Sequence, residues 1–226
     1  MEFSNVAKNY LSKLRRNSDW IVGNSSEITD YLTGQQIPAF DALVDFQMNF
    51  SGLNLTVAGK PGSSFEARLF SKKDIDKNER IEIIKNNGRF YFDCGSHKTA
   101  QFYFGINDLG QVVTNYYDET PIIIASSFNK WIEIHALEDF LLSSNQFEIP
   151  YYCNLIDIKA FEKITEKFTP NVETNDNYNT WLANGELIIN KGTWFDRQEF
   201  YVHIYATKKS KGEDFFKILL KEKIIR

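Results

Sequence analysis

Cysteine, proline and methionine are scarce in this 226-residue sequence, which contains two, five and two of them respectively. Two cysteines could form one disulfide, so their number alone does not decide the compartment. Long hydrophobic runs are also missing, and no stretch approaches the roughly 18 apolar residues of a membrane-spanning helix. The N-terminal stretch MEFSNVAKNYLSKLRRN has no signal-peptide core, and its basic residues follow the apolar ones. We therefore expect a cytoplasmic protein with two free thiols and no membrane partner.

Positive charge is in short supply as well. The chain has 26 Lys and Arg against 30 Asp and Glu, which gives a net charge of −4 and a pI of about 5.5. A domain that binds DNA or RNA normally has a basic face and a high pI. The charge balance therefore argues against direct nucleic-acid binding as the main function.

Four motifs that are common in enzymes are absent from the sequence, namely GxGxxG, GxxxxGK[ST], HExxH and GxSxG. The glycine-containing stretch AGKPGSSF, residues 58–65, leads into the alternating sequence FEARLF. A phosphate cradle needs such a loop to lead into a helix N-terminus, so this stretch predicts a hairpin loop instead. We expect no cofactor and no catalytic residues.

Aromatic residues are plentiful, with 19 Phe and 11 Tyr, and they indicate a folded chain rich in strands. Hydrophobic spacing near 3.6 predicts helices over residues 2–17, 24–32, 37–53 and 128–144. Pro38 suits the first turn of the third helix. Gly52 suits its left-handed end.

Between residues 53 and 125 the hydrophobic period changes from 3.6 to 2, which is typical of strands. Asn86-Asn87-Gly88 and residues 107–110 are strong hairpin turns within this region. Successive hairpins predict an antiparallel meander. Because a sheet must cover its apolar side, we expect the helix over 128–144 to lie across it.

The last third of the chain predicts a helix over 159–168 and strands in GELIINKG and DRQEFYVHIYATKKS, while FFKILLKEKII suits a strand or a helix. The predicted fold class is therefore α+β, with a central, mainly antiparallel sheet of hairpins flanked by amphipathic helices. We place the first domain at residues 1–145. Residues 146–226 would form a C-terminal α+β extension packed on it.

The stretch YFDCGSH, residues 91–97, brings a thiol, a carboxylate and a histidine together. Catalytic Cys–His pairs usually come from distant parts of a chain, and a structural zinc site needs four ligands. The remaining Cys and His residues, Cys153, His135 and His203, are scattered singly. We therefore predict that Cys94 ends a strand as a core thiol, that the following residues form a turn, and that no metal binds.

An acidic segment between residues 118 and 139 is the main candidate for partner binding. It contains five acidic residues against one Lys130, and two tyrosines precede it. Exposed aromatic rings beside carboxylates suit a basic partner, although the carboxylates of the helix could equally form an ordinary solvated face. The candidate partner-binding residues are Tyr116, Tyr117, Asp118, Glu119, Glu133 and Glu138.

The order of these parts resembles the SUKH superfamily over about residues 25–145. A helix ends in a small-residue turn in FDALVDFQMNFSGL, hairpins follow with FDCGSHKTAQFYFGINDLGQVV, and IASSFNKWIEIHALEDFLLSS caps and forms a closing helix. The N-terminal helix and residues 146–226 have no counterpart in that pattern.

The resemblance implies a non-enzymatic role. Many bacterial members are similar to immunity proteins, which would bind and block a cognate polymorphic toxin, such as a nuclease or deaminase, in the cytosol of the producing cell. A basic toxin protein is thus the expected partner. Two alternatives remain open, namely a scaffold or ligand-binding module with an apolar pocket between sheet and helix, and an enzyme built on Cys94 or a carboxylate pair.

Overall fold

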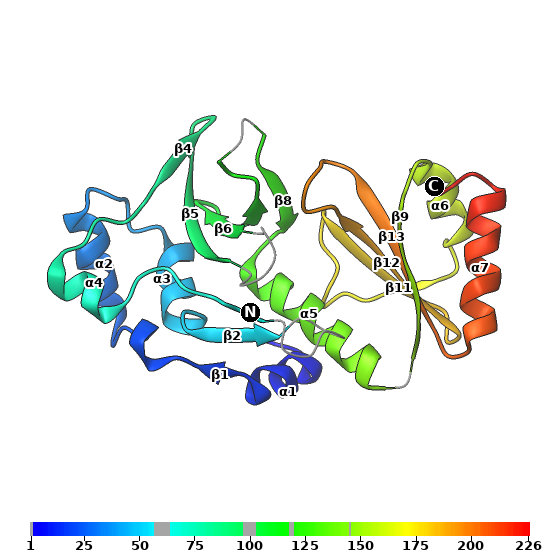
Figure 1. Cartoon of the computed structure of the whole chain (residues 1–226), viewed down its shortest axis with the longest axis horizontal. Helices are drawn as coiled ribbons and strands as arrows, with labels where there is room; N and C mark the ends of the chain where they lie inside the picture. The colour runs from blue at the N-terminus through cyan, green and yellow to red at the C-terminus, as the bar shows by residue number, and fades with distance from the viewer. Residues whose placement is uncertain (1, 57–63, 97–102, 118–119, 145) are drawn as a thin grey trace. The chain divides into compact units, whose positions relative to one another are not determined.

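The computed structural model describes residues 2–56, 64–96, 103–117, 120–144 and 146–226 (Figure 1). Over these ranges the chain has an α+β fold with seven α-helices and three antiparallel sheets, as the sequence predicted. It divides into two compact units, which we call the N-terminal unit (Asn9–Ile123) and the C-terminal unit (Met1–Lys8 with Ile124–Arg226). Among the described helices, none is long and apolar enough to cross a membrane.

The helices of the first half follow the predicted order. They are α1 (Asn5–Lys13), the 3-10 turn η1 (Ser18–Trp20), α2 (Ser25–Gly34), α3 (Asp41–Asn49) and α4 (Lys72–Lys77). Asn24 caps α2, since its side chain accepts a hydrogen bond from the backbone N–H of Glu27 at 2.8 Å. Gly52 has a φ of +87°, and a Cβ there would lie 2.4 Å from the carbonyl oxygen of Asn17. The predicted left-handed glycine is therefore confirmed.

Two details of these helices differ from the prediction. Pro38 lies before α3, which begins only at Asp41, so the proline is not in the first turn. Helix α4 was not predicted because it buries none of its residues and has no apolar stripe to read. Its N-terminus is a capping box between Ser71 and Asp74, and it ends at the left-handed Asn78.

Two sheets belong to the predicted hairpin region. The smaller has the order β1-β2-β3, and the larger has the sequential order β4-β5-β6-β7-β8 of a meander. The strands are β1 (Arg15–Arg16), β2 (Leu53–Thr56), β3 (Ser64–Glu66), β4 (Ile84–Asn86), β5 (Arg89–Ser96), β6 (Tyr103–Asn107), β7 (Val112–Thr114) and β8 (Ile122–Ala125). Asn87 and Gly88 join β4 to β5 with φ values of 48° and 75°, which suits a tight hairpin turn.

The C-terminal unit is a five-stranded sheet with helices on both faces. Its elements are α5 (Phe128–Ser143), β9 (Phe147–Asn154), α6 (Ile158–Ile164), β10 (Thr169–Pro170), β11 (Asn179–Ala183), β12 (Leu187–Thr193), β13 (Phe200–Ala206) and α7 (Lys209–Lys221). The strand order is β10-β11-β12-β13-β9, so β9 is an edge strand. The segment that suited a strand or a helix is therefore largely helical, in α7.

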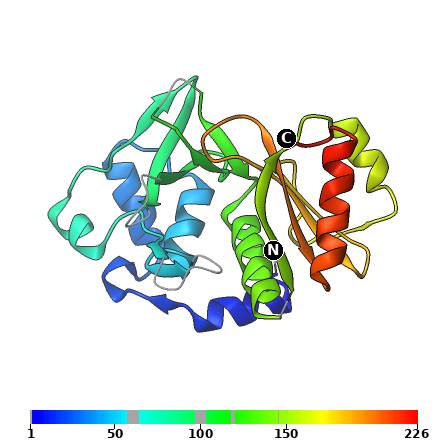
Figure 2. The same cartoon turned by 45° about the vertical axis from the view of Figure 1, so that its right-hand side comes forward.

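Strand β13 shows how the sequence pattern builds this sheet. Val202, Ile204 and Ala206 pack with Phe215 and Leu219 of α7 on one side, which we call the α7 face. The alternate residues of the strand point to the opposite side, the α5 face. There Tyr205 packs with Trp181 and with Ile134 and Leu141 of α5. Figures 1 and 2 show the sheet lying between α5 and α7.

The position of α5 differs from the prediction. We expected this helix to close the hairpin domain, with a boundary at residue 145. Its buried Ile134 and Leu141 instead contact Trp181 and Tyr205, and the C-terminal unit begins at Ile124. An amphipathic pattern shows which side of a helix is apolar but does not show which sheet covers it.

Candidate functional site

The predicted partner-binding tyrosines have different environments. Tyr116 is fully buried, its ring stacks on Tyr91 at a centroid distance of 6.5 Å, and its hydroxyl donates to the carbonyl of Phe104. Burial raises its pKa well above the ordinary tyrosine value. Tyr117 is 53% exposed. Tyr116 is therefore a core residue, and the prediction that it contacts a partner is wrong.

Glu133 is also buried, with 7% of its surface exposed. Its two carboxylate oxygens accept hydrogen bonds from the backbone N–H and the hydroxyl of Ser4, each at 2.7 Å. The same hydroxyl accepts the N–H of Ala7 in the first turn of α1. Glu133 thus anchors the N-terminal residues of its own unit on α5, and its prediction as an exposed partner-binding residue is wrong.

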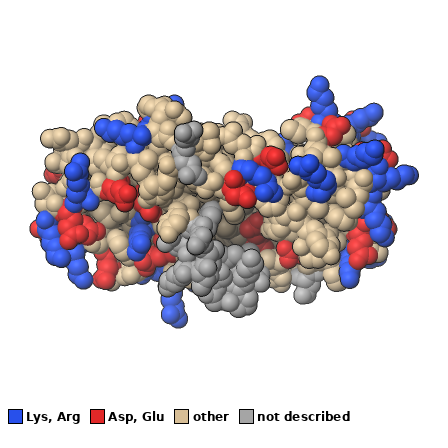
Figure 3. All heavy atoms as spheres, turned by 45° about the horizontal axis from the view of Figure 1, so that its top comes forward, with Lys and Arg blue, Asp and Glu red and all other residues tan. Residues whose placement is uncertain are grey.

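The two remaining candidates that the structure describes, Tyr117 and Glu138, belong to different units. Glu138 is partly buried on α5, with a carboxylate oxygen 3.6 Å from Nδ1 of His135. Tyr117 belongs to the N-terminal unit and Glu138 to the C-terminal unit. Asp118 and Glu119 lie outside the described residues. On the face drawn in Figure 3, acidic side chains are interspersed with basic ones, which crowd the end of the C-terminal unit at the right.

Cys94 is a core thiol, as predicted. It is fully buried in β5, and its Sγ lies 3.4 Å from the carbonyl oxygen of Phe92. Burial, with the charge of Asp93, raises its pKa well above the ordinary value, so the reactive thiolate is disfavoured. Gly95 is not a turn, because it sits at a bulge and β5 continues to Ser96. His97 lies outside the described residues, and no group of three potential metal ligands occurs within them.

The N-terminal unit has two neighbouring pockets that share Arg80, Ile81 and Glu82. The larger, of about 480 Å³, is also lined by Gln35, Gln36, Ile83 and Lys85. The smaller, of about 230 Å³, is also lined by Tyr31, Leu69, Phe70, Asp74, Glu79 and Asp93. Polar and charged side chains dominate both linings. They differ from the apolar cavity that we expected of a ligand-binding module.

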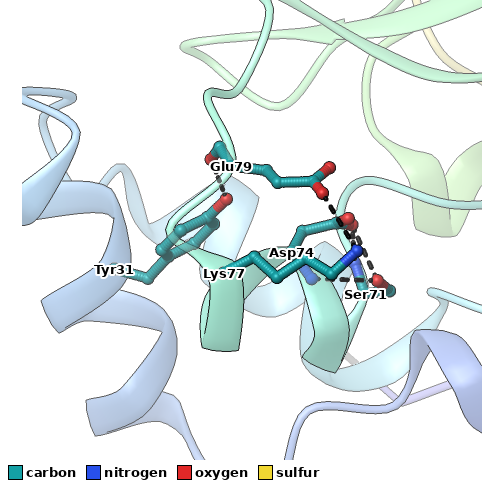
Figure 4. A network of polar contacts seen from close by, with 5 residues as sticks. All are labelled: Tyr31, Ser71, Asp74, Lys77 and Glu79. Carbon is teal, nitrogen blue, oxygen red and sulfur yellow. Dashed lines mark hydrogen bonds and ion pairs between the residues drawn. The ribbon is translucent and has the colours of Figure 1, made fainter.

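A polar network builds one wall of the smaller pocket (Figure 4). The hydroxyl of Tyr31 donates to the carbonyl of Glu79, and Nζ of Lys77 lies 3.5 Å from the Glu79 carboxylate. The Asp74 carboxylate accepts from the backbone N–H of Ser71 at 2.6 Å and from its hydroxyl at 2.8 Å. These contacts hold α4 and the segment that follows it in place. Each of these polar groups therefore already has a partner within the protein.

The C-terminal unit carries an aromatic cluster at the β9 edge, which we call the edge cluster. It consists of Tyr152, Trp194, Arg197, Tyr201 and His203. The ring of Tyr152 stacks on the ring of His203 at a centroid distance of 3.9 Å. It contacts Tyr201 edge-on at a centroid distance of 5.1 Å. Trp194 lies 5.2 Å from Tyr201 and 6.2 Å from Tyr152. Three strand and loop segments thus contribute to one group of contacting rings.

An irregularity in β9 places Tyr152 in this cluster. The pairing of β9 with β13 shifts between Ile149 and Cys153, so residues 150–152 lie opposite the single residue His203. Pro150, which lacks an N–H, sits in this bulge and suits an edge strand. Tyr151 stacks on Phe216 of α7 at 5.9 Å, whereas Tyr152 stacks on His203. The two adjacent tyrosines point to opposite faces, as neighbouring strand residues do, and the bulge sets the pairing that leaves Tyr152 opposite His203.

His203 is the buried centre of the edge cluster. Its Nε2 lies 3.1 Å from the carbonyl oxygen of Ile149 and 3.1 Å from the Glu148 carboxylate. Because both neighbours are acceptors, the tautomer with hydrogen on Nε2 fits the site. Burial lowers the pKa of His203 to about 4, against the opposing effect of the Glu138 charge and the Ile149 carbonyl. The ring is therefore neutral at neutral pH.

Arg197 covers Trp194 from the side of the loop between β12 and β13. Its guanidinium carbon lies 4.3 Å from the centre of the indole ring. The guanidinium also donates to Oδ1 of Asn154 at 3.0 Å and lies 3.4 Å from the Glu199 carboxylate. These contacts make the arginine a fixed part of the surface rather than a mobile side chain.

Further exposed aromatic residues lie on β9 and on the loop that carries Trp194. Tyr152 is 45% exposed, and Phe147, Tyr151 and Phe195 are also exposed. We did not predict this surface, because β9 was not predicted as a strand. The predicted alternation of β13 does place Tyr201, His203 and Tyr205 on one face. The sequence therefore predicted the contribution of β13 to this face, but not that of β9.

No protein-family model, curated protein or solved structure matches this chain.

Proposed function

We propose that this chain is a non-enzymatic binding protein and that its partner docks on the edge cluster. The observation that supports this proposal is the exposed ring of Tyr152 beside the partly exposed Trp194 and Arg197 at the β9 edge. These three residue types dominate the binding energy of protein interfaces, where rigid rings supply contact area at a low cost in entropy. Here Tyr152 and Arg197 are held in place by His203 and Trp194, so the surface is ordered before a partner arrives.

The geometry of β9 favours docking on side chains over addition of a strand. A regular edge strand would offer its backbone to a partner strand. In β9 the bulge at residues 150–152 interrupts the regular edge. The end of the strand is also occupied, because Asn154 and Arg226 exchange backbone hydrogen bonds at 3.0 and 3.1 Å. The side chains of the α5 face are then the available binding elements.

The resemblance to the SUKH superfamily supports a more specific proposal. In it the chain is a cytoplasmic immunity protein, and the partner is a basic toxin protein whose activity is blocked by binding. The carboxylates of Glu138 and Glu148, which lie close to the edge cluster, would suit a basic partner. The core position of Cys94 supports the non-enzymatic part of the proposal.

Affinity capture followed by an interface variant tests this proposal. The tagged chain would be used to recover partners from its native organism at moderate salt, with identification by mass spectrometry. Tyr152→Ala should weaken binding of a stoichiometric partner about 10-fold or more, because it removes a central aromatic contact. The matched control is Tyr151→Ala, which removes an exposed ring from the opposite face of the same strand. Equal binding by both variants and the unchanged chain would contradict this placement of the interface.

A second candidate function follows from the larger pocket of the N-terminal unit. Gln35, Gln36, Arg80 and Lys85 offer amide groups and two positive charges around a space of about 480 Å³, against the single negative charge of Glu82. This lining suits a small polar anion better than an apolar ligand. A thermal-shift screen of small carboxylates and phosphates, repeated with Arg80→Ala, tests it. A stabilising compound whose effect persists in the variant would not bind through this pocket.

A further inference from the structure

Tyr152 presents two different ring faces. One face stacks on the buried His203 with an interplanar angle of 24°, and 45% of the residue remains exposed to solvent. Tyr201 contacts the ring edge-on, with an interplanar angle of 71°, and Trp194 is tilted against it by 53° at a centroid distance of 6.2 Å, so neither of these two rings stacks on it. Among the described Lys and Arg residues, none lies over this ring. The outer face is thus an electron-rich surface held in a fixed orientation.

Two carboxylates lie close to this ring, and the positive charge of the edge cluster, Arg197, is itself paired with Asp196 at 3.3 Å and Glu199 at 3.4 Å. Glu148 lies beside His203, on which Tyr152 stacks, and 38% of its side chain is exposed. Glu138 approaches from α5, and its charge adds to burial in raising the pKa values of Tyr152 and Tyr201. At neutral pH the intervening His203 is uncharged, so it adds no positive charge between them. A cation near Tyr152 would therefore gain from the ring and from both carboxylates.

The same unit already uses aromatic faces to hold cations. Arg197 lies over Trp194 at 4.3 Å, and Nζ of Lys191 lies over Phe200 at 5.1 Å. In the first pair the guanidinium is also held by an oxygen acceptor, Asn154 Oδ1. The outer face of Tyr152, with the Glu148 carboxylate nearby, offers a similar combination of ring and acceptor.

We infer that the outer face of Tyr152 receives the guanidinium or ammonium group of an arginine or lysine side chain of the partner, with Glu148 and Glu138 as the acidic neighbours. This inference rests on the proposed function, since it names the chemistry of the residue that docks there. A neutral apolar side chain on the same face is the competing occupant, and a side chain of a second copy of this chain is another. The two carboxylates favour the cation.

An NMR titration of the full chain with small probes tests the inference without the natural partner. Nα-acetyl-arginine amide, Nα-acetyl-lysine amide and Nα-acetyl-norleucine amide would be added to protein carrying ¹³C-labelled tyrosine rings. We expect saturable shifts of the Tyr152 ring signals with the two cationic probes, and a binding constant that weakens as salt is raised. The norleucine probe has a similar length and no charge, so it should give little shift.

Variants assign the effect to the ring and its neighbours. Tyr152→Leu should abolish binding of the cationic probes, whereas Tyr152→Phe should retain it because the ring face remains. Glu148→Gln should weaken binding about 2- to 5-fold, the range expected for one exposed electrostatic contact. Tyr151→Leu is the matched control and should leave binding unchanged. The signals of buried Tyr116 and Tyr205 report in each variant whether the fold is intact.

Equal shifts with the norleucine probe, or no saturable shift of Tyr152 with either cation, would overturn the inference. Self-association that depends on protein concentration, with the same Tyr152 shifts, would show a second copy in place of a basic partner and would also overturn it. The proposed function is tested separately. If a captured partner depends on Tyr152 but the chain binds none of the cationic probes, the proposed function stands and only this inference is overturned.

Discussion

At the scale of single residues, Glu133 shows how a predicted surface group can be structural. Its carboxylate holds Ser4 through two hydrogen bonds of 2.7 Å, one of them to a backbone N–H. We expect Glu133→Gln to reduce the free energy of unfolding by about 2–3 kcal/mol, since a charged acceptor of two donors is lost. Urea denaturation measures the change. Glu162→Gln, an exposed position on α6, is the control and should stay within about 0.5 kcal/mol; an equal loss in both would contradict the buried role of Glu133.

His203 gives a prediction about pH at the same scale. Its pKa is about 4 in the folded chain against 6.5 for an ordinary histidine, so between these values the unfolded state binds a proton that the folded state does not. Stability should therefore fall as the pH is lowered from 6.5 to 4, by up to about 3 kcal/mol from this group. The charged and titratable groups that face His203 are Glu138, Glu148, Tyr152 and Tyr205, and the charge of Glu138 opposes the lowering of its pKa by burial.

The measurement for His203 is a difference between two proteins. Urea denaturation of the unchanged chain and of His203→Asn would be compared at several values between pH 7.5 and 4.5. Carboxylates titrate in both proteins. Only the change with pH in the difference between the two free energies of unfolding therefore reports on His203. The gap between the two should narrow as the pH falls. If the free energies of unfolding of the two proteins ran parallel over this pH range, His203 would bind its proton equally well in the folded and the unfolded state.

At the scale of elements, short helix α4 depends on its cap. Ser71 and Asp74 exchange the hydrogen bonds of a capping box, and the helix buries none of its own residues. Ser71→Ala should therefore cost about 1 kcal/mol, and the loss should appear first as faster amide exchange in residues 74–78. Lys73→Ala changes an exposed residue of the same helix and serves as the control. Unchanged exchange in the Ser71 variant would mean that tertiary contacts alone hold α4.

The same scale separates what the sequence could predict from what it could not. Turn chemistry was sufficient where one residue type meets one backbone need, as at Gly88 and Gly52, which both have positive φ values. It was insufficient for β9, where Pro150 argues against a central strand and a bulge replaces regular alternation. The edge cluster depends on that bulge, because it brings Tyr152 onto His203. A site that forms through a local irregularity leaves little trace in periodicity.

At the scale of the whole molecule, the two ends of the chain belong to the same compact unit. Residues 1–8 belong with residues 124–226, and the sequence-predicted boundary at 145 falls inside that unit. The reason is tertiary: Ile134 and Leu141 of α5 cover Trp181 and Tyr205 on the sheet. The apolar side of a helix could be predicted from the sequence. Which sheet the helix packs against depends on long-range contacts, and the periodicity of the sequence does not contain them.

This arrangement predicts different behaviour for two fragments. A fragment of residues 146–226 loses α5 and would expose Trp181, which is fully buried in the whole chain. We expect it to lack cooperative unfolding and to show the red-shifted emission of solvent-exposed tryptophan. A fragment of residues 124–226 keeps α5 and lacks the Ser4 contacts to Glu133 and the buried Ala7, so it should unfold cooperatively, with a deficit of at least about 2–3 kcal/mol relative to the same fragment carrying residues 1–8 through a flexible linker. Cooperative unfolding of the shorter fragment would instead restore the boundary at 145 and make α5 dispensable to the C-terminal sheet.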